Sequence, residues 1–407
     1  MSPEWADRLQ QAIAESFDRL VATAIERDVD FVVFAGDLAD NSRPSYGDFV
    51  RFYEGLERLD AAGIPVYLIA GNHDPYTMWA RDIDRLPASA RLLGAGKPEF
   101  TLFRKEGEPT CIIGGRSYYT QTWQDGQNVC EGISREEGVQ ALEPTDPDVA
   151  DAPFTIGVIH TGMQADKDKS PVEERELLAR SVDYWACGHL HYRVVLPNDR
   201  DPRIVFPGCI QASDIKESGE HGCFLVELSE NPAGRSQVQL EFVPLSSVVL
   251  QRLRVDVSAC LTLADVVRLV QASLFHENSR VHCDDIVARV TLTGKTPLHE
   301  FLQSDKVISD LREHINNAHP NYYCDAIADS TRMPSESARS HAEGMFPAIL
   351  EDMASEQRAR EDVLVNYVQS ELVKRDISVP DSLVRRIGEF NATAEMITRD
   401  LLSEESE

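Results

Sequence analysis

The sequence lacks several features that would point to particular classes of protein. No apolar run approaches the ~18–20 residues of a membrane-spanning helix, so no membrane partner is expected. The chain opens with polar Ser2-Pro3-Glu4, and a secretory signal peptide is therefore not expected either. None of the eight cysteines shows C-x-x-C spacing, and several lie in apolar runs. They are predicted to be buried reduced thiols in a cytoplasmic protein.

Basic residues are also scarce. The 407 residues contain 40 Lys and Arg against 68 Asp and Glu, a formal net charge of −28. This balance argues against a strong electrostatic grip on nucleic acid. It does not exclude a nuclease whose metals face the phosphate and whose partner protein supplies the affinity for DNA. A purely solubilising acidic surface explains the charge equally well.

Polar side chains follow two apolar runs that read as buried parallel strands. The segment Val29–Asp40 (VDFVVFAGDLAD) delivers Asp37, and the loop Ala70–Pro75 (AGNHDP) delivers Asn72 and His73. Continuous runs of β-branched and aromatic residues are typical of strands buried on both faces. In open α/β sheets, ligands bind at the carboxyl ends of such strands. These three residues are therefore candidates for a binding site.

Two later segments repeat the arrangement. Phe154–Gly162 (FTIGVIHTG) ends its strand at His160, and Asp183–His191 (DYWACGHLH) ends at His189 and His191. Taken singly, each residue has an ordinary explanation, such as a capped turn, a core histidine or a surface residue. Four strand ends that each offer a ligand-type side chain favour a metal site. Asp, Asn and His without thiolates suit a hard or borderline divalent cation such as Mn²⁺.

The order GD…GNHD…H…GHxH resembles the calcineurin-like metallophosphoesterase superfamily. Together with the stretches Phe206–Gln211 and Glu217–Val226, it is most similar to the DNA repair exonuclease branch, which includes the nuclease subunit of the bacterial SbcCD complex. The resemblance covers about residues 5–245. It implies an α/β fold, a four-layer sandwich of two central mixed sheets flanked by helices. A small α/β capping domain and a helical C-terminal tail would follow.

The resemblance also implies a domain organisation and partners. Residues 1–245 would form the nuclease domain, 246–330 the capping domain and 345–402 a helical region that docks a partner. An alternative for 345–402 is a helical hairpin that packs on its own core. The implied function is hydrolysis of DNA phosphodiesters in repair, together with an SbcC-like ATPase, and a homodimer is a further expectation. A phosphoesterase for small phosphodiesters or nucleotides is the second hypothesis.

Roles follow for the site residues by resemblance. Two divalent ions, with Mn²⁺ expected, would be bridged by Asp37, and one ion would be completed by Asn72, His160 and His189. His191 belongs to the other ion. His73 is not a ligand but a catalytic residue, which acts as general acid or stabilises charge on the phosphoryl group. Asp74 would orient His73 or cap the loop, and Trp79 is predicted to be a core residue.

One family motif is missing. The family places a strand that ends in Asp-x-His before the first helix, and both residues are metal ligands. No His in this sequence has an Asp two residues before it, and the helix predicted over 4–27 comes first. We therefore expect the second metal site to be incomplete in this chain and a start codon further upstream. The alternative is a catalytically impaired interaction subunit.

The remaining pattern predicts further elements of the nuclease domain. Short strands are expected at 100–103 and 111–114, a short helix near 135–142, and a helix over 171–180 that starts at Pro171. Four strands near 193–196, 203–206, 222–228 and 238–243 are predicted to complete a second sheet. Asn231–Gly234 is predicted to be the hairpin turn between the last two strands.

Overall fold

The structure is a computed structural model that describes residues 2–38, 46–80, 83–123, 127–163 and 169–334. The predicted docking region 345–402 lies outside these residues. The chain divides into two compact units, and the first contains Met1–Val255, Val267–Thr291 and Ser309–Ala328. All candidate site residues belong to this first unit. No helix of the described residues combines the length and apolar character needed to cross a bilayer.

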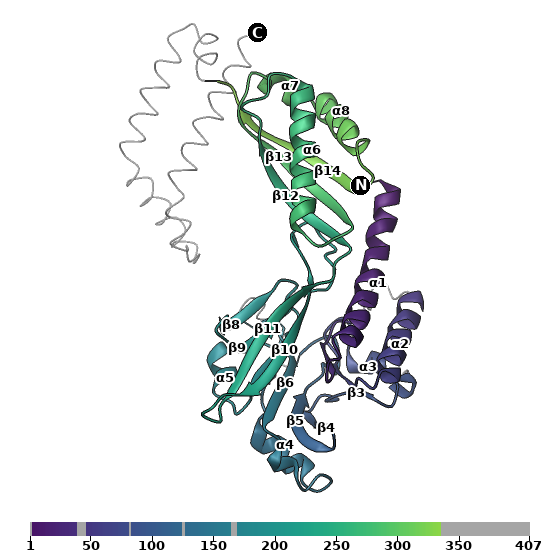
Figure 1. Cartoon of the computed structure of the whole chain (residues 1–407), viewed down its shortest axis with the longest axis vertical. Helices are drawn as coiled ribbons and strands as arrows, with labels where there is room; N and C mark the ends of the chain where they lie inside the picture. Colours follow the sequence, from purple (N-terminus) through teal and green to yellow (C-terminus); the bar gives the residue numbers. More distant parts are fainter. Residues whose placement is uncertain (1, 39–45, 81–82, 124–126, 164–168, 335–407) are drawn as a thin grey trace, which may run out of the picture. The chain divides into compact units, whose positions relative to one another are not determined.

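The first sheet is short and parallel, with strand order β1-β2-β3. Its strands are β1 (Val32–Ala35), β2 (Val66–Ile69) and β3 (Ala90–Leu92). Helices α1 (Pro3–Glu26) and α2 (Tyr46–Ala61) lie beside each other (Figure 1) and pack on this sheet. Ser2 caps α1 by accepting a hydrogen bond from the backbone N–H of Trp5. The helix predicted over 4–27 and the two strands predicted before Asp37 and Asn72 are confirmed here, whereas β3 was not predicted.

The second sheet has six strands in the order β4-β5-β6-β7-β9-β8. It is mixed, because β5, β6, β7 and β9 run parallel while β4 and β8 pair antiparallel at the two edges. A separate antiparallel hairpin joins β10 to β11. The bounds are β4 (Glu99–Lys105), β5 (Glu108–Gly115), β6 (Phe154–His160), β7 (Tyr184–Gly188), β8 (Val194–Asn198), β9 (Asp201–Phe206), β10 (Gly222–Glu230) and β11 (Ser236–Pro244).

Short helices occupy the connections of this part. They are α3 (Tyr76–Trp79), α4 (Arg135–Leu142) and α5 (Glu174–Leu178), with 3₁₀ turns at Ile83–Arg85 and Val149–Asp151. The prediction of a helix over 171–180 was too long. A capping box between Glu173 and Glu176 starts the helix at Glu174, so Pro171 lies before the cap rather than inside the first turn.

Three apolar clusters show how the layers stack. Along β5, Ile112 packs in one cluster and Ile113 in another, and along β6 Val158 and Ile159 separate in the same way. Because successive side chains of a strand point to opposite faces, both faces of the six-stranded sheet are buried. The cluster that contains Ile113 and Val158 also contains Ile69 of β2, while a third cluster joins α1 and α2 to the first sheet. The predicted four-layer sandwich is confirmed, although its first sheet is parallel rather than mixed.

The prediction that four late strands complete the second sheet is confirmed for two of them and wrong for the other two. Strand β9 pairs parallel with β7, Trp185 opposite Ile204, so β8 and β9 extend the six-stranded sheet. Only β10 and β11 form the hairpin, and its turn at Asn231–Gly234 is as predicted: the Asn231 N–H donates to the Arg235 carbonyl. Alternation of side chains cannot distinguish these pairings, because all four strands bury one face against the same apolar layer.

The last described part is a three-stranded sheet with helices, in the order β12-β13-β14. Its elements are β12 (Val248–Asp256), α6 (Leu263–Arg280), β13 (Asp285–Lys295), α7 (His299–Leu302), α8 (Asp305–Asn316) and β14 (Tyr322–Arg332). The mixed α/β character expected for this stretch is present, although β14 was not predicted. A capping role for residues 246–330 stays a prediction.

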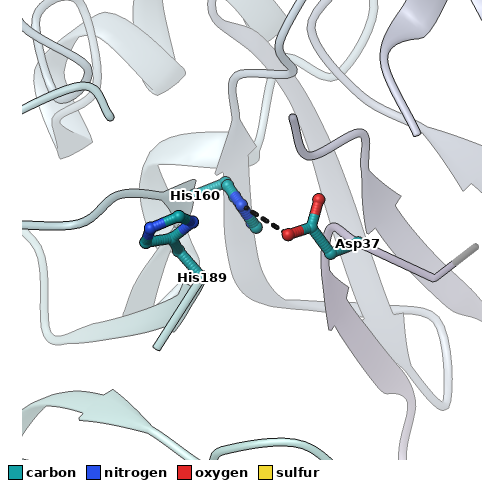
Figure 2. A group of neighbouring side chains, drawn as sticks. All are labelled: Asp37, His160 and His189. Atoms are coloured by element: carbon teal, nitrogen blue, oxygen red, sulfur yellow. Dashed lines mark ion pairs between the residues drawn. The ribbon is translucent and has the colours of Figure 1, made fainter. Parts of the chain in front are cut away.

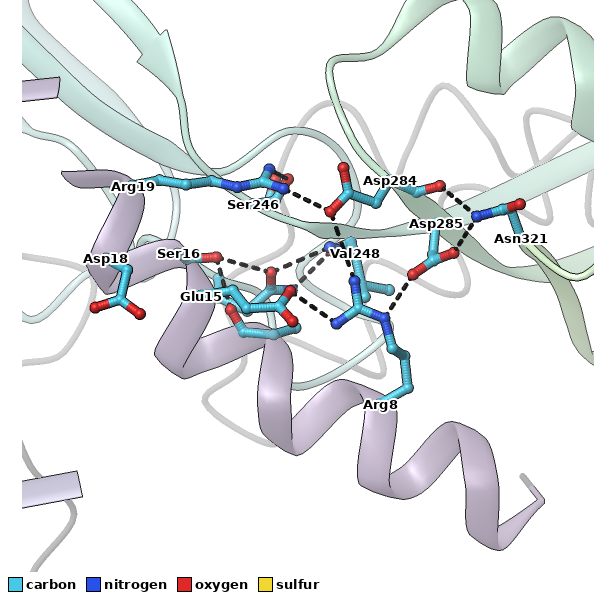
Figure 3. A network of polar contacts seen from close by, with 12 residues as sticks. Arg8, Glu15, Ser16, Asp18, Arg19, Ser246, Val248, Asp284, Asp285 and Asn321 are labelled. Carbon is cyan, nitrogen blue, oxygen red and sulfur yellow. Dashed lines mark hydrogen bonds and ion pairs between the residues drawn. The ribbon is translucent and has the colours of Figure 1, made fainter. Parts of the chain in front are cut away.

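Helix α1 is tied by ion pairs to residues far along the chain (Figure 3). Arg8 Nε donates to Asp285 Oδ2 at 2.6 Å, and its Nη1 donates to Glu15 Oε2 at 2.8 Å. Asn321 Nδ2 donates to the other Asp285 oxygen at 2.7 Å. Trp5 stacks on Tyr323 with ring centroids 5.2 Å apart. These contacts hold α1 in place, although no strand precedes it in the described residues.

Candidate metal centre

Four side chains from four strand ends meet at one point. Asp37 lies two residues after β1, Asn72 follows β2, His160 ends β6 and His189 directly follows β7. His160 Nε2 is 3.1 Å from Asp37 Oδ2 and 3.1 Å from Asn72 Oδ1, and His189 Nδ1 is also 3.1 Å from Asn72 Oδ1. Figure 2 shows the His160 ring between Asp37 and His189. The candidate ligand atoms of these three residues lie within 4.8 Å of one another.

Glycines allow this close approach. A Cβ on Gly188 would lie 2.9 Å from the Ala35 carbonyl carbon and closer still to its oxygen. A Cβ on Gly71 would lie 2.6 Å from the Asp37 backbone nitrogen. Real Cβ atoms essentially never approach other atoms within 3.0 Å, so a side chain at either position would push the strand ends apart. Small residues are therefore required where the two sheets converge.

Two of the converging residues have strained backbones. Asp37 has a φ of 55° and His189 a φ of 97°, in the left-handed region that L-residues rarely adopt. Such conformations cost on the order of 1–3 kcal/mol each and persist where the surroundings determine them. The strain coincides with the cluster of ligand-type atoms, which is typical of functional sites.

The surroundings of His160 determine which ring nitrogen faces the cluster. Its side chain is fully buried, and Nδ1 lies 2.8 Å from the Ala35 carbonyl oxygen. Because a carbonyl only accepts, Nδ1 carries a hydrogen. Nε2 faces Asp37 and Asn72 and is therefore the nitrogen placed to serve as a metal ligand.

Asp74 holds the two motif loops together. It is fully buried and accepts hydrogen bonds from the backbone N–H groups of Asp37, Leu38 and Gly71 and from the Trp79 indole. Burial, together with the charge of Asp37, raises its pKa to about 6. Of its two predicted roles, the loop cap is the one that these contacts show. Trp79 is a core residue, as predicted.

Asp37 remains an anion in this setting. Burial alone would raise its pKa, but the hydrogen bond and charge of His160, with the N–H of His73, lower it to about 2. The backbone N–H of His73 donates to Asp37 Oδ1 at 2.8 Å, while the His73 side chain is exposed. His73 is thus attached to the cluster through its backbone. Its catalytic role stays a prediction.

His191 does not join this cluster. Its Nδ1 lies 2.6 Å from Glu217 Oε1, and it forms a second group of candidate ligands with Cys209 and Glu217. Burial raises the pKa of Glu217, but the His191 ring and the N–H groups of Ser213 and Asp214 lower it by more, so the net shift is downward. Burial raises the pKa of the Cys209 thiol to about 12. The assignment of His191 to a second ion stays a prediction.

The first cluster fits a divalent cation. It offers one carboxylate, one amide oxygen and two imidazole nitrogens, a donor set that suits Mn²⁺, Fe²⁺ or Zn²⁺. Separations of about 3 Å between donors are those expected when several atoms share an ion at bond lengths of ~2.0–2.2 Å. The thiols are not part of it, and none of the eight cysteines, all of which lie in the described residues, forms a disulfide.

Comparison with known proteins relates the part of the chain that contains this cluster to a known family. A model of the calcineurin-like phosphoesterase family matches residues 9–193, which include all six predicted site residues. The chain carries a calcineurin-like metallophosphoesterase domain. A second model, described as the middle domain of metallophosphoesterase YhaO, matches residues 251–332. The domain that spans residues 9–193 is therefore that of a metal-dependent hydrolase.

Several relatives align with this domain and beyond. The uncharacterized metallophosphoesterase YhaO of Bacillus subtilis is 28% identical over 73% of this chain and 70% of its own length. The DNA double-strand break repair protein Mre11 of Haloferax volcanii is 32% identical over 59% of this chain and 49% of its own length. Mre11 of Sulfurisphaera tokodaii is 41% identical over 47% of this chain and 46% of its own length. The chain thus spans about half the length of these two Mre11 proteins.

Sequence reasoning gave Glu217 no role and did not predict the full set of contacts of Asp74. Glu217 stands at the start of a family motif, but its pairing with His191 is visible only in the fold. The sequence also does not predict how many N–H groups donate hydrogen bonds to Asp74. The one sequence signal is that Glu217 and Asp74 each lie in a motif of the family, although neither is predicted to bind a metal.

Proposed function

We propose that this protein hydrolyses phosphodiesters in DNA, as an exonuclease or endonuclease of DNA repair that works with an SbcC-like ATPase. The observation that carries the proposal is the meeting of Asp37, Asn72, His160 and His189 at the ends of four strands. The Mre11 relatives, whose names refer to repair of DNA double-strand breaks, support DNA as the substrate. The net charge of −28 fits a nuclease whose partner supplies DNA affinity.

The residues of the phosphoesterase domain have separate roles in this proposal. Divalent cations, when bound, would stabilise the charge that develops on a phosphoryl group and would lower the pKa of the attacking water. Asp37, Asn72, His160 and His189 supply the donors that hold a cation, with Mn²⁺ as the metal we propose. The exposed His73 donates a proton to the leaving oxygen or stabilises the phosphoryl charge. Asp74 keeps Asp37 and the His73 loop in register.

The charge balance favours one competing function. A net charge of −28 disfavours long polyanions, so a hydrolase of small phosphodiesters or nucleotides is the second candidate. The purified chain is assayed with Mn²⁺ on linear duplex, single-stranded and nicked DNA and on a chromogenic phosphodiester. Cleavage of DNA at a higher kcat/KM supports the first proposal, and cleavage of only the chromogenic ester supports the second.

Two variants test the roles. His73→Ala is expected to retain Mn²⁺ and to lose ~10²–10⁴-fold in kcat, the usual contribution of a general acid or base. Asp37→Asn is expected to lose both Mn²⁺ and activity. A protein that binds Mn²⁺ but cleaves none of these substrates contradicts the proposed function and favours an interaction subunit.

A further inference from the structure

Glu217 is a carboxylate held on three sides by donors. Its Oε1 lies 2.6 Å from His191 Nδ1, and its Oε2 accepts from the backbone N–H groups of Ser213 at 2.9 Å and Asp214 at 3.3 Å. The Glu217 side chain is 16% exposed, whereas that of His191 is 57% exposed. The fixed member of the pair is therefore the carboxylate, and the ring takes its orientation from it.

The hydrogen bond determines which nitrogen of His191 is available. An ionised carboxylate only accepts, so Nδ1 carries the hydrogen and Nε2 of the neutral ring keeps a lone pair that points away from Glu217. His160 is prepared in the same way, with Nδ1 bonded to the Ala35 carbonyl and Nε2 directed into the metal centre. A carboxylate behind a metal-binding histidine fixes both the tautomer and the ring orientation.

Cys209 makes different contacts. Its Sγ lies 3.2 Å from His221 Nδ1 and 3.6 Å from the His191 backbone carbonyl oxygen. The thiol is thus engaged with neighbours other than the His191 ring, whereas Glu217 faces that ring directly. This geometry favours Glu217 as a support for His191 over a three-residue site that would take a soft metal through the sulfur.

We propose that Glu217 is the positioning residue of His191: it holds the Nδ1–H tautomer and aims Nε2 as a ligand for a second divalent cation. The inference rests on the proposed metal-dependent function. It assigns a role to the Glu217 motif, which the roles of the first cluster leave unexplained.

Replacement by glutamine makes a sharp test. The side-chain amide of Glu217→Gln would have one acceptor oxygen where the carboxylate has two, and the Ser213 and Asp214 N–H groups compete for it. With the oxygen facing those two donors, the amide NH₂ faces His191 and requires an unprotonated Nδ1. Glu217→Gln is therefore expected to shift His191 toward the Nε2–H tautomer without changing the volume of the side chain.

The readout is long-range ¹H–¹⁵N NMR of the metal-free full-length chain labelled with ¹⁵N-histidine, with His191 assigned by the signals lost in His191→Asn. The wild-type chain is expected to show Nδ1–H at His191, and Glu217→Gln the opposite tautomer. The matched control is Glu220→Gln, which alters another Glu–His pair, with His282 at 3.1 Å. That control is expected to leave His191 unchanged. An Nε2–H tautomer in the wild-type chain overturns the proposal without any variant.

Metal binding provides the second readout. Because the second site lacks the Asp-x-His ligands, isothermal titration of the wild-type chain with Mn²⁺ is expected to show a second ion that binds more weakly than the first. In Glu217→Gln the second ion is expected to bind a further 10–100-fold more weakly, with the first ion unchanged. Absence of a second ion in the wild-type chain overturns the proposal. So does a thiolate-to-Co²⁺ absorption band that disappears in Cys209→Ser, because the sulfur would then be a ligand. If the tautomer and binding results hold but no phosphodiester is cleaved, the proposed function fails and the role of Glu217 stands.

Discussion

Replacing Gly71 by alanine tests the convergence of the two sheets most directly. The added Cβ would lie 2.8 Å from Asp37 Cγ and 2.6 Å from the Asp37 backbone nitrogen, whereas ordinary contact begins at 3.4 Å. Moving Cγ from 2.8 Å to 3.4 Å requires a shift of about 0.6 Å, roughly three times the ~0.2 Å tolerance of metal–ligand distances. The Asp37 carboxylate must therefore leave the position in which it contacts His160.

Two magnitudes follow for Gly71→Ala. Overpacking is expected to lower the free energy of unfolding of the metal-free protein by about 1–3 kcal/mol. Displacing a ligand that other groups hold in place is expected to weaken Mn²⁺ binding at the first cluster at least 10–100-fold, or about 1.4–2.7 kcal/mol. Urea unfolding with EDTA measures the first quantity, and isothermal titration with Mn²⁺ measures the second.

The control is Gly63→Ala, at the end of α2. Gly63 has a φ of 75° and no atom within 4 Å of a built Cβ, so alanine there strains the backbone without a clash. It is expected to lower stability by about 1–2 kcal/mol and to leave Mn²⁺ affinity unchanged. The reasoning is refuted if Gly71→Ala binds Mn²⁺ as tightly as the wild-type chain, because Asp37 would then tolerate the displacement.

Three further predictions use other parts of the first unit. Because His189 has a φ of 97°, His189→Gly is expected to be about 1 kcal/mol more stable than His189→Ala in metal-free urea unfolding, while both lose Mn²⁺ binding; equal stabilities would show that the backbone is not strained. Asp74 keeps its proton up to about pH 6 in the folded chain but only to 3.8 as a free side chain, so its contribution to stability falls as pH rises between those values, by about 3 kcal/mol. Asp74→Asn removes this pH dependence. The free energy of unfolding of the metal-free wild-type chain, minus that of Asp74→Asn, should therefore fall between pH 4 and pH 7. A difference that stays constant would contradict the raised pKa of Asp74. The lowered pKa of Asp37, about 2, changes the stability only at pH values below 4, outside this range. Arg8→Ala leaves Asp285, whose side chain is 10% exposed, without its ion pair and should cost about 1–3 kcal/mol in urea unfolding. Arg51→Ala breaks an exposed ion pair with Asp18 at 3.3 Å and should lower the free energy of unfolding by less than about 1 kcal/mol. If Arg8→Ala and Arg51→Ala lower it equally, burial of Asp285 does not strengthen its ion pair.

The sequence by itself determined most of the local elements near the site and singled out the residues of the candidate metal centre. Apolar runs predicted β1, β2, β6 and β7, and the carboxyl ends of those strands delivered Asp37, Asn72, His160 and His189. Within each sheet this succeeds because neighbouring parallel strands align their carboxyl ends, which brings Asp37 near Asn72 and His160 near His189. The packing of one sheet on the other, which the sequence did not show, brings the two pairs together.

Only the tertiary structure decided which distant groups meet. The placement of β9 beside β7, the four donors around Asp74 and the contact of His191 with Glu217 each join residues that no local pattern connects. Arg8 and Asp285 are separated by 277 residues, and their pairing depends on how α1 packs rather than on either neighbourhood. Such contacts are set by the sum of apolar burial and loop closure over the whole unit, whereas propensity and periodicity report only on a few neighbouring residues.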